Sequence, residues 1–170
     1  RELIGRNDNG ALFSNELWDI TSFTVSKDAM YCEDLVKLPY LKSLSIEGQS
    51  FDSIRFLASL SELTELTLNN CRFMVSDLSI IASLPNLQRL TLSGCSLSTI
   101  AGLENAQNLV YLNLANNTIR NLNPLANMMK LQEIDLEHNA LTSLTSLSGL
   151  GNLQKLNVSY NSLTSLAPLA

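Results

Sequence analysis

One spacing of leucines dominates this chain and constrains its fold. From Leu131 the apolar residues follow the phrase L-x-x-I-x-L-x-x-N-x-L-x-x-L-x-x-L-x-x-L, and Leu153 begins the phrase again 22 residues later. Self-similarity at a fixed period of this length indicates a repeat architecture. A single unit cannot bury its own apolar edge. The repeat therefore predicts stacked units that bury these residues against one another.

Each unit contains two kinds of apolar spacing. Ile134 and Leu136 alternate with polar residues, as in a short strand whose side chains point to opposite faces. After Asn139 the apolar residues recur at every third position, which suits a 3₁₀ or irregular segment better than an α-helix. We therefore expect a strand, a turn at the asparagine and a return leg in every unit.

The asparagine at the turn has a predicted structural role. A side-chain amide both donates and accepts hydrogen bonds, so it can pair with the turn backbone of its own coil and of the next. A buried turn without such a partner would leave backbone groups unpaired, at about 1–3 kcal/mol each. The alternative is that these asparagines are ordinary surface loop residues. Their regular recurrence favours the structural role.

The phrase recurs along most of the chain. We expect seven units that start near Ile20, Leu41, Leu63, Leu87, Leu109, Leu131 and Leu153, so that the repeat domain covers residues 20–170. The third unit is 24 residues long, and its extra residues near Met74–Asp77 predict a bulge on the return side. The chain stops at Ala170 within a unit. We therefore expect the natural chain to continue or another molecule to cover this end.

Residues 1–19 do not follow the repeat. They contain a turn, Arg6-Asn7-Asp8-Asn9-Gly10, between short apolar runs, and they carry the only tryptophan, Trp18. The exposed end of a stack needs a cover, so we interpret this segment as an N-terminal cap or the tail of a preceding segment. A binding role for Trp18 is the alternative interpretation.

Charge and composition argue against two classes of partner. The formal net charge is −5 and the sequence pI is about 4.8, which disfavours a nucleic-acid backbone as the partner. No stretch approaches the roughly 20 apolar residues of a membrane span. We therefore expect no nucleic-acid binding and no membrane insertion in this segment, whereas the oligomeric state stays open.

The cysteines and the histidine of this chain are not spaced like the residues of a known catalytic or metal-binding site. Cys71 and Cys95 fall at the asparagine position and Cys32 at a return-leg apolar position, so all three are predicted to be buried thiols. A Cys71–Cys95 disulfide is disfavoured because side chains of adjacent coils point the same way. His138, the only histidine, has no nucleophile at a recognisable spacing. We predict that the chain is not an enzyme and uses no cofactor or metal.

The whole phrase resembles the leucine-rich repeat, in the short 22-residue form of bacterial internalins and of the SDS22 phosphatase regulator. The resemblance covers residues 20–170, with Asp28 and Gln49 replacing asparagine in the first two units and cysteine replacing it in the next two. It implies an α/β-type solenoid: a right-handed arc with a parallel sheet on the concave face and 3₁₀ or irregular return legs on the convex face. It also implies protein binding on that sheet.

The outward face of the strands is the expected binding surface. The third, fifth and seventh residues of each unit point to solvent, and Glu65 and Arg89 are neighbours in the third-position column. Near the C-terminal end, acidic residues and tyrosines gather on this face, and tyrosine is enriched at binding surfaces. The predicted partner-binding residues are Tyr111, Asn113, Glu133, Asp135, Glu137, His138, Asn157 and Tyr160.

Two other roles for this face remain open at this stage. The face can be an inert solvated surface with binding elsewhere. It can also hold Ca²⁺ on its three acids, although a flat strand converges ligands poorly.

Three functions fit the sequence. The first is a protein-binding repeat module of a bacterial secreted or cell-surface protein, because the spacing resembles internalins and the exposed positions are rich in Ser, Thr and Asn. The second is a cytoplasmic regulatory subunit that resembles the SDS22 phosphatase regulator, which suits three reduced cysteines. The third is a structural spacer. The sequence favours an extracellular or surface location, with the cytoplasm as the alternative.

Overall fold

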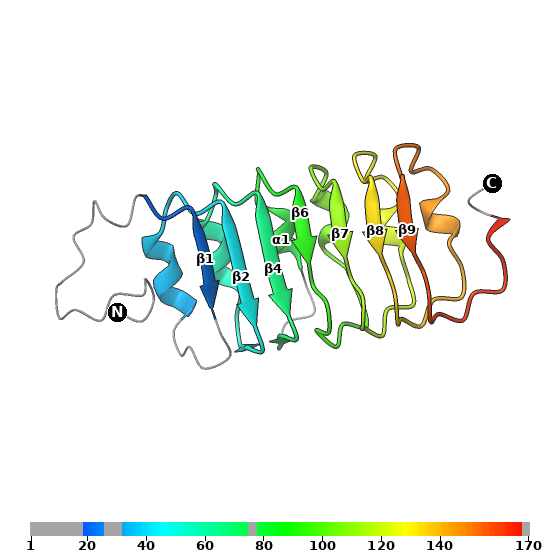
Figure 1. Ribbon diagram of the computed structural model, residues 1–170, viewed down its shortest axis with the longest axis horizontal. Helices are drawn as coiled ribbons and strands as arrows, with labels where there is room; N and C mark the ends of the chain where they lie inside the picture. The colour runs from blue at the N-terminus through cyan, green and yellow to red at the C-terminus, as the bar shows by residue number, and fades with distance from the viewer. Residues whose placement is uncertain (1–18, 26–31, 75–77, 168–170) are drawn as a thin grey trace.

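The computed structural model describes residues 19–25, 32–74 and 78–167. Its strands and short helices alternate along the chain (Figure 1). The elements are β1 Ser22–Val25, η3 Cys32–Lys37, β2 Ser43–Glu47, β3 Ser50–Phe51, η4 Arg55–Ser59, β4 Glu65–Asn69, β5 Arg72–Phe73, α1 Ser79–Ala82, β6 Arg89–Thr91, η5 Leu103–Asn105, β7 Tyr111–Asn113, η6 Asn123–Leu125, β8 Glu133–Asp135, η7 Thr145–Leu147 and β9 Lys155–Asn157.

Seven strands form one parallel sheet in the order β1-β2-β4-β6-β7-β8-β9. Equivalent positions of successive units pair directly: Leu44 lies opposite Leu66, and Leu112 lies opposite Ile134. The 24-residue unit keeps this register, because Leu66 of β4 pairs with Leu90 of β6. The predicted parallel solenoid is therefore confirmed, and the extra residues do not disturb the sheet.

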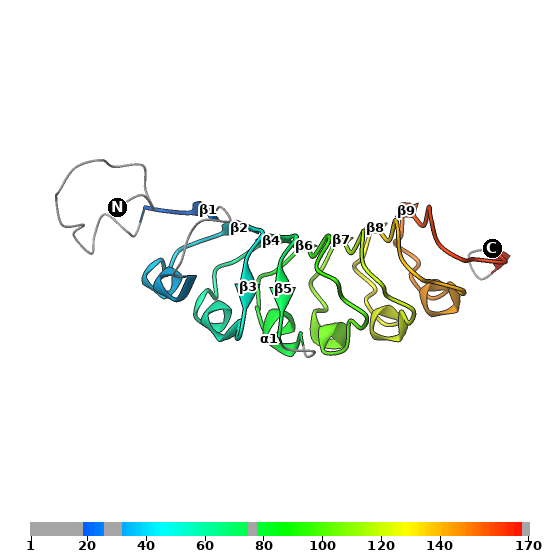
Figure 2. The same ribbon diagram turned by 90° about the horizontal axis from the view of Figure 1, so that it is seen from below.

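The coils follow an arc with the strands on its inner side and the short helices on its outer side (Figure 2). In the described part of the chain, the return legs with η3 to η7 carry 3₁₀ helices, as the spacing of three predicts. One leg differs: Ser79–Ala82 forms a single α-helical turn after the inserted residues. The inner side of the arc is the concave sheet face that the resemblance implies.

The leucine columns form one continuous core. Four of the leucines that open a unit have no exposed surface: Leu41, Leu63, Leu109 and Leu131. Burying such a side chain stabilises the fold by roughly 1.5–3 kcal/mol before chain entropy is subtracted. In the last coil the equivalent Leu153 is only partly buried.

The asparagine ladder is present in the last three units, but each amide bonds its own coil and the preceding coil rather than the next one. The Asn117 amide accepts hydrogen bonds from the N–H groups of Cys95 and Leu97 in the preceding coil, at 3.1 and 2.9 Å. Its Nδ2 donates to the carbonyls of Leu92, Leu114 and Ala115. Asn139 and Asn161 form the equivalent bonds to the preceding coil one and two units further along the chain. Each asparagine therefore joins two adjacent coils.

Two further repeated hydrogen bonds were not predicted. Asn86, Asn108 and Asn152, at the turn before a strand, each donate to a carbonyl of the preceding coil. At the start of the return legs, a side-chain oxygen accepts the N–H two residues on, as a local turn. The residues that do so are Ser53, Thr99, Asn121, Ser143 and Ser165.

A second, two-stranded sheet was also missed. β3 and β5 pair in parallel just after the turns of the second and third units. Phe51 of β3 stacks on Phe73 of β5 with ring centroids 5.9 Å apart, and it also contacts Phe56. A two-residue strand has no periodicity to detect in the sequence, whereas the aromatic pair that accompanies it lies at matching positions of two units.

Three predictions fall on residues outside the described part of the chain. The N-terminal cap, apart from Asp19, lies there with Trp18. The bulge near Met74–Asp77 lies there except for Met74. The chain end at Ala170 lies there as well.

Candidate functional site on the concave sheet face

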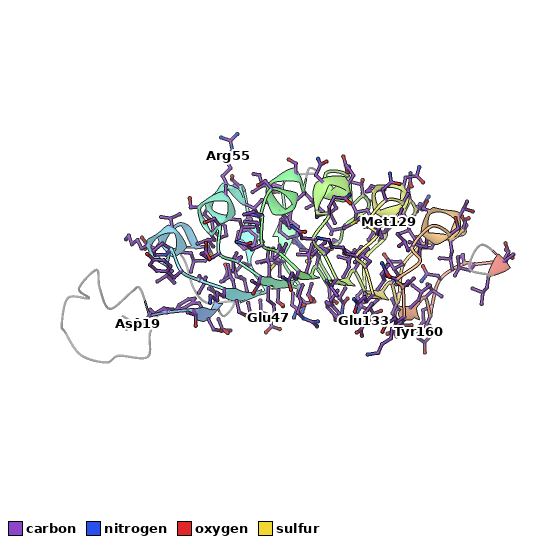
Figure 3. The ribbon with its side chains drawn as sticks, turned by 90° about the horizontal axis from the view of Figure 1, so that it is seen from above. Asp19, Glu47, Arg55, Met129, Glu133 and Tyr160 are labelled. Carbon is purple, nitrogen blue, oxygen red and sulfur yellow. The ribbon has the colours of Figure 1, made fainter. Side chains whose placement is uncertain are left out.

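The sheet presents three columns of side chains on its concave side, and the strand register defines them. The third-position column runs through Ser43, Glu65, Arg89, Tyr111 and Glu133, which pair strand by strand. Glu47, Glu133 and Tyr160 project from the strand side of the molecule, whereas Arg55 projects from the opposite side (Figure 3). The predicted face therefore exists as a continuous surface.

One predicted outward position is wrong. Ala115, in the seventh-position column, has 5% of its surface exposed and belongs to the buried residues. Its side chain is a single methyl group, which is too short to rise above the longer side chains beside it. The columns therefore describe the direction of a side chain, whereas exposure also depends on its length and its neighbours.

The third-position column balances its own charges. Arg89 Nε lies 3.7 Å from Glu65 Oε1, as the spacing suggested, and the Arg89 guanidinium lies 4.1 Å from the centroid of the Tyr111 ring. One coil further on, Lys155 Nζ lies 3.3 Å from Glu133 Oε2. The predicted site residues Tyr111 and Glu133 are therefore already engaged with cations of this chain.

In β7, β8 and β9 the residue of the fifth-position column is the last residue of the strand. The side-chain oxygens of Asn113, Asp135 and Asn157 accept the N–H two residues on, at 2.9, 3.0 and 3.1 Å. Such local bonds compete with the strand ladder and turn the chain. These three predicted site residues have a structural role in addition to their place on the face. The oxygen-bearing short side chain at this position is the signal that sequence reasoning overlooked.

The residue after the seventh-position column has left-handed backbone in six units: Gly48, Asn70, Gly94, Asn116, His138 and Tyr160 have φ between 51° and 68°. Glycine and asparagine adopt this conformation most readily. At Gly94 a Cβ atom would lie 2.3 Å from Asn70 Oδ1, so a substitution there would require the Asn70 side chain to move. His138 and Tyr160 carry the bulkiest side chains in this column.

His138 and Tyr160 form a stacked pair at the rim of the concave face. Their ring centroids are 4.1 Å apart and the interplanar angle is 2°. His138 Nε2 lies 3.8 Å from Glu137 Oε1, and Asn157 Nδ2 donates to Glu137 Oε2 at 3.1 Å. Tyr160 is 70% exposed. The structure therefore brings Glu137, His138, Asn157 and Tyr160 into one group.

The eight predicted residues all lie on or beside β7, β8 and β9. Asn113, Asp135 and Asn157 are register partners across these strands, and Tyr111 and Glu133 pair beside them. His138 and Tyr160 lie just beyond the strand ends rather than on the strands. The N-terminal strands instead present small hydroxyl residues in the fifth-position column, including Ser45, Thr67 and Thr91.

The two cysteines of the turn ladder are buried free thiols. Cys95 Sγ donates to the carbonyls of Leu68 and Ser93, and Cys71 Sγ donates to those of Ile46 and Asn69. Burial raises the pKa of the Cys95 thiol to about 12 and also raises the pKa of Cys71. Because the thiolate is the reactive form, both groups are poor nucleophiles. Cys32 is buried at the start of η3.

Within residues 19–25, 32–74 and 78–167, no group of three or more His, Cys, Asp or Glu side chains is arranged to hold a metal ion. No helix in this part of the chain is long and apolar enough to cross a membrane.

Comparison with known proteins supports the architecture. The family model described as leucine-rich repeats (2 copies) matches residues 85–127 and 107–149, and that described as leucine-rich repeat matches residues 152–170. Together with the seven-stranded parallel sheet, these matches identify the chain as a leucine-rich repeat protein. A search of curated proteins found no match.

Solved structures with the same fold include two internalins from Listeria monocytogenes. InlF is 22% identical with a TM-score of 0.75, over 94% of this chain and 54% of that chain. Internalin C2 is 24% identical with a TM-score of 0.72, over 99% of this chain and 84% of that chain. TLR13, solved as a complex with ssRNA13, is 28% identical with a TM-score of 0.68, over 84% of this chain and 21% of that chain. This chain therefore spans about half of InlF.

Proposed function

We propose that the chain is a protein-binding module of a bacterial secreted or cell-surface protein and recognises its partner protein on the concave sheet face. The observation that carries this proposal is the group of exposed and half-buried aromatic and polar side chains across β7, β8 and β9. Tyr160 is 70% exposed beside His138, and Asn113 and Asp135 lie next to each other on the open face. Exposed aromatic residues with polar neighbours are typical of protein interfaces.

The likeness to internalins supports the surface setting of this proposal. The serine, threonine and asparagine residues that fill the exposed strand positions point the same way. The buried thiols are compatible with an oxidising compartment, because the high pKa and burial of Cys95 keep it from reacting. They are equally compatible with the cytoplasm, so a regulatory subunit resembling the SDS22 phosphatase regulator remains the second candidate.

Nucleic acid is disfavoured as the partner, although TLR13 was solved with a single-stranded RNA. Phosphate binding requires cationic side chains. On β8 and its flank this chain presents Glu133, Asp135 and Glu137, and the nearby Lys155 already pairs with Glu133.

The location is tested on the full-length native protein by fractionation and by protease treatment of intact cells. Release of the repeat region by external protease supports the secreted or surface setting. Protection of the whole pool inside the cell contradicts it, and binding to a phosphatase catalytic subunit is then the next experiment.

The binding face is tested by photo-crosslinking in those cells. A photoreactive residue replaces Asn113 on the concave face in one variant and the exposed Arg55 on the opposite side in the matched control (Figure 3). We expect Asn113 alone to trap a partner, and Tyr111→Ser with Asp135→Asn to abolish trapping. Equal trapping from Arg55 contradicts the concave site, and no trapping from either position favours a spacer.

A further inference from the structure

The charges of the concave face are paired unevenly along the arc. Glu65 pairs with Arg89 and Glu133 pairs with Lys155, so the third-position column is balanced at both points. Within the described residues Asp135 has no ion pair, and the Glu137 carboxylate contacts the amide of Asn157 and the ring of His138. The sheet face at β8 therefore keeps an unneutralised negative charge beside an exposed aromatic pair.

The same face shows how it accommodates a guanidinium group. Arg89 lies between the carboxylate of Glu65, at 3.7 Å, and the ring of Tyr111, at 4.1 Å from the centroid. A guanidinium group combines the two interactions, because its planar fork pairs with carboxylates and its face stacks on aromatic rings. At Asp135 and Glu137 the face offers the same two groups, a carboxylate and an aromatic ring, and no lysine or arginine of the described residues pairs with them.

We propose that an arginine side chain of the partner protein lies across Asp135 and Glu137, against the stacked rings of His138 and Tyr160. This inference rests on the proposed protein-binding function and names the chemistry of the partner. Charge complementarity selects a cation, and the neighbouring ring pair selects arginine over lysine. Lysine is a strongly hydrated point charge without a planar face.

Hydrogen bonds and ring stacking hold the side chains of this site in place. Asn157 Nδ2 donates to Glu137 Oε2, and the Asp135 side chain is fixed by the N–H of Glu137. The His138 and Tyr160 rings hold each other in parallel planes 4.1 Å apart. Little side-chain freedom is therefore left to lose when the arginine binds, which favours affinity.

The test uses the purified chain and four labelled peptides of one length that alternate Gly-Ser with arginine, lysine, citrulline or glutamate. Fluorescence anisotropy at about 0.15 M salt limits the contribution of long-range attraction. We expect the arginine peptide to bind about tenfold or more tightly than the lysine and citrulline peptides, because it alone combines charge with the fork. The glutamate peptide should not bind.

Variants locate the binding site. We expect Asp135→Asn and Glu137→Gln each to weaken the arginine peptide about fivefold or more. Tyr160→Asn, which keeps a residue suited to the left-handed backbone, should remove most of the preference for arginine over lysine. Glu62→Gln removes the same single charge at an exposed turn before β4 and should leave binding unchanged. Thermal unfolding of each variant verifies that it remains folded.

Several outcomes overturn this inference. Equal affinity for the arginine and lysine peptides, or an equal effect of Glu62→Gln, means bulk charge attraction only. Absence of arginine-peptide binding also overturns it. The proposed function fails separately: if the photoreactive residue at Asn113 traps a protein while the arginine peptide does not bind, the concave binding face stands and the arginine site falls.

Discussion

The third and fourth units and the last three units stabilise the same turn with different chemistry. At Cys71 and Cys95 a thiol donates weak hydrogen bonds to two carbonyls. At Asn117 an amide accepts two N–H groups and donates to three carbonyls. The thiol therefore satisfies fewer groups with weaker bonds. Both kinds of side chain donate to a carbonyl of the preceding coil, and asparagine adds an oxygen that accepts N–H groups of that coil.

The two regions also differ at the ends of their strands. β2 and β4 have five residues each, and the short β3–β5 sheet with its phenylalanines follows them. The later strands have three residues each, and Asn113, Asp135 and Asn157 turn the chain there. The early units thus gain apolar contact and backbone pairing, whereas the late units gain a polar open face. We propose that the partner binds at these later strands, β7, β8 and β9.

The largest difference is expected from removing the turn side chain in each region. Asn117→Ala leaves buried backbone groups of two coils without partners, at about 1–3 kcal/mol each, so we expect a loss of at least about 3 kcal/mol. Cys95→Ala should cost about 1–2 kcal/mol, because only weak thiol bonds are lost. Urea denaturation measures both. Equal costs would remove the proposed distinction, and exposed Asn108→Ala serves as the control.

The core should not distinguish the two regions. Leu68 and Leu136 occupy the same position of their units, and neither has exposed surface. We expect Leu68→Ala and Leu136→Ala each to cost about 2–5 kcal/mol in denaturant melts. A cost below about 1 kcal/mol for Leu136→Ala would mean that this residue is not core. Leu166→Ala, at a side chain that is 60% exposed, should change stability by less than about 0.5 kcal/mol.

Alkaline pH should reduce the contribution of the Cys95 thiol to stability. Folding raises the pKa of Cys95 from 9.0 to about 12 because burial disfavours the thiolate. The unfolded chain then loses the proton first, so this contribution is fully present below pH 9 and is lost as the pH rises towards 12. The stability difference between the natural chain and Cys95→Ala should fall by about 1.4 kcal/mol per pH unit in that window.

Parallel urea melts of these two proteins at several pH values measure that fall, and titration of shared lysines and tyrosines cancels in the difference. A difference that stays constant with pH would mean that the thiol is not held in a buried, protonated form.

The smallest effect is expected from the charge pairs of the sheet face. Arg89→Met keeps much of the side-chain length but removes the contacts with Glu65 and the cation–π contact with Tyr111. Exposed pairs of this kind contribute about 0–1 kcal/mol, so thermal melts should move only slightly. A loss above about 2 kcal/mol would mean that the face is a stability element rather than a binding surface.

Much of the fold could be predicted because the same residue spacing recurs in successive units. The strand register, the asparagine ladder and the Glu65–Arg89 neighbours all follow from counting 22 or 24 residues along one chain. Positions that depend on one neighbour could not be predicted in this way. The burial of Ala115 and the pairing of β3 with β5 are examples.

The sequence by itself determined the architecture of this protein. A leucine phrase that repeats seven times allows one arrangement in which every apolar edge is buried, and each copy reinforces the register of the next. Only the tertiary structure decided which side chains of the concave face contact one another. Tyr111 under Arg89, and His138 against Tyr160, are contacts between coils that depend on side-chain direction and backbone conformation at single positions. No periodicity encodes such contacts, because each occurs once.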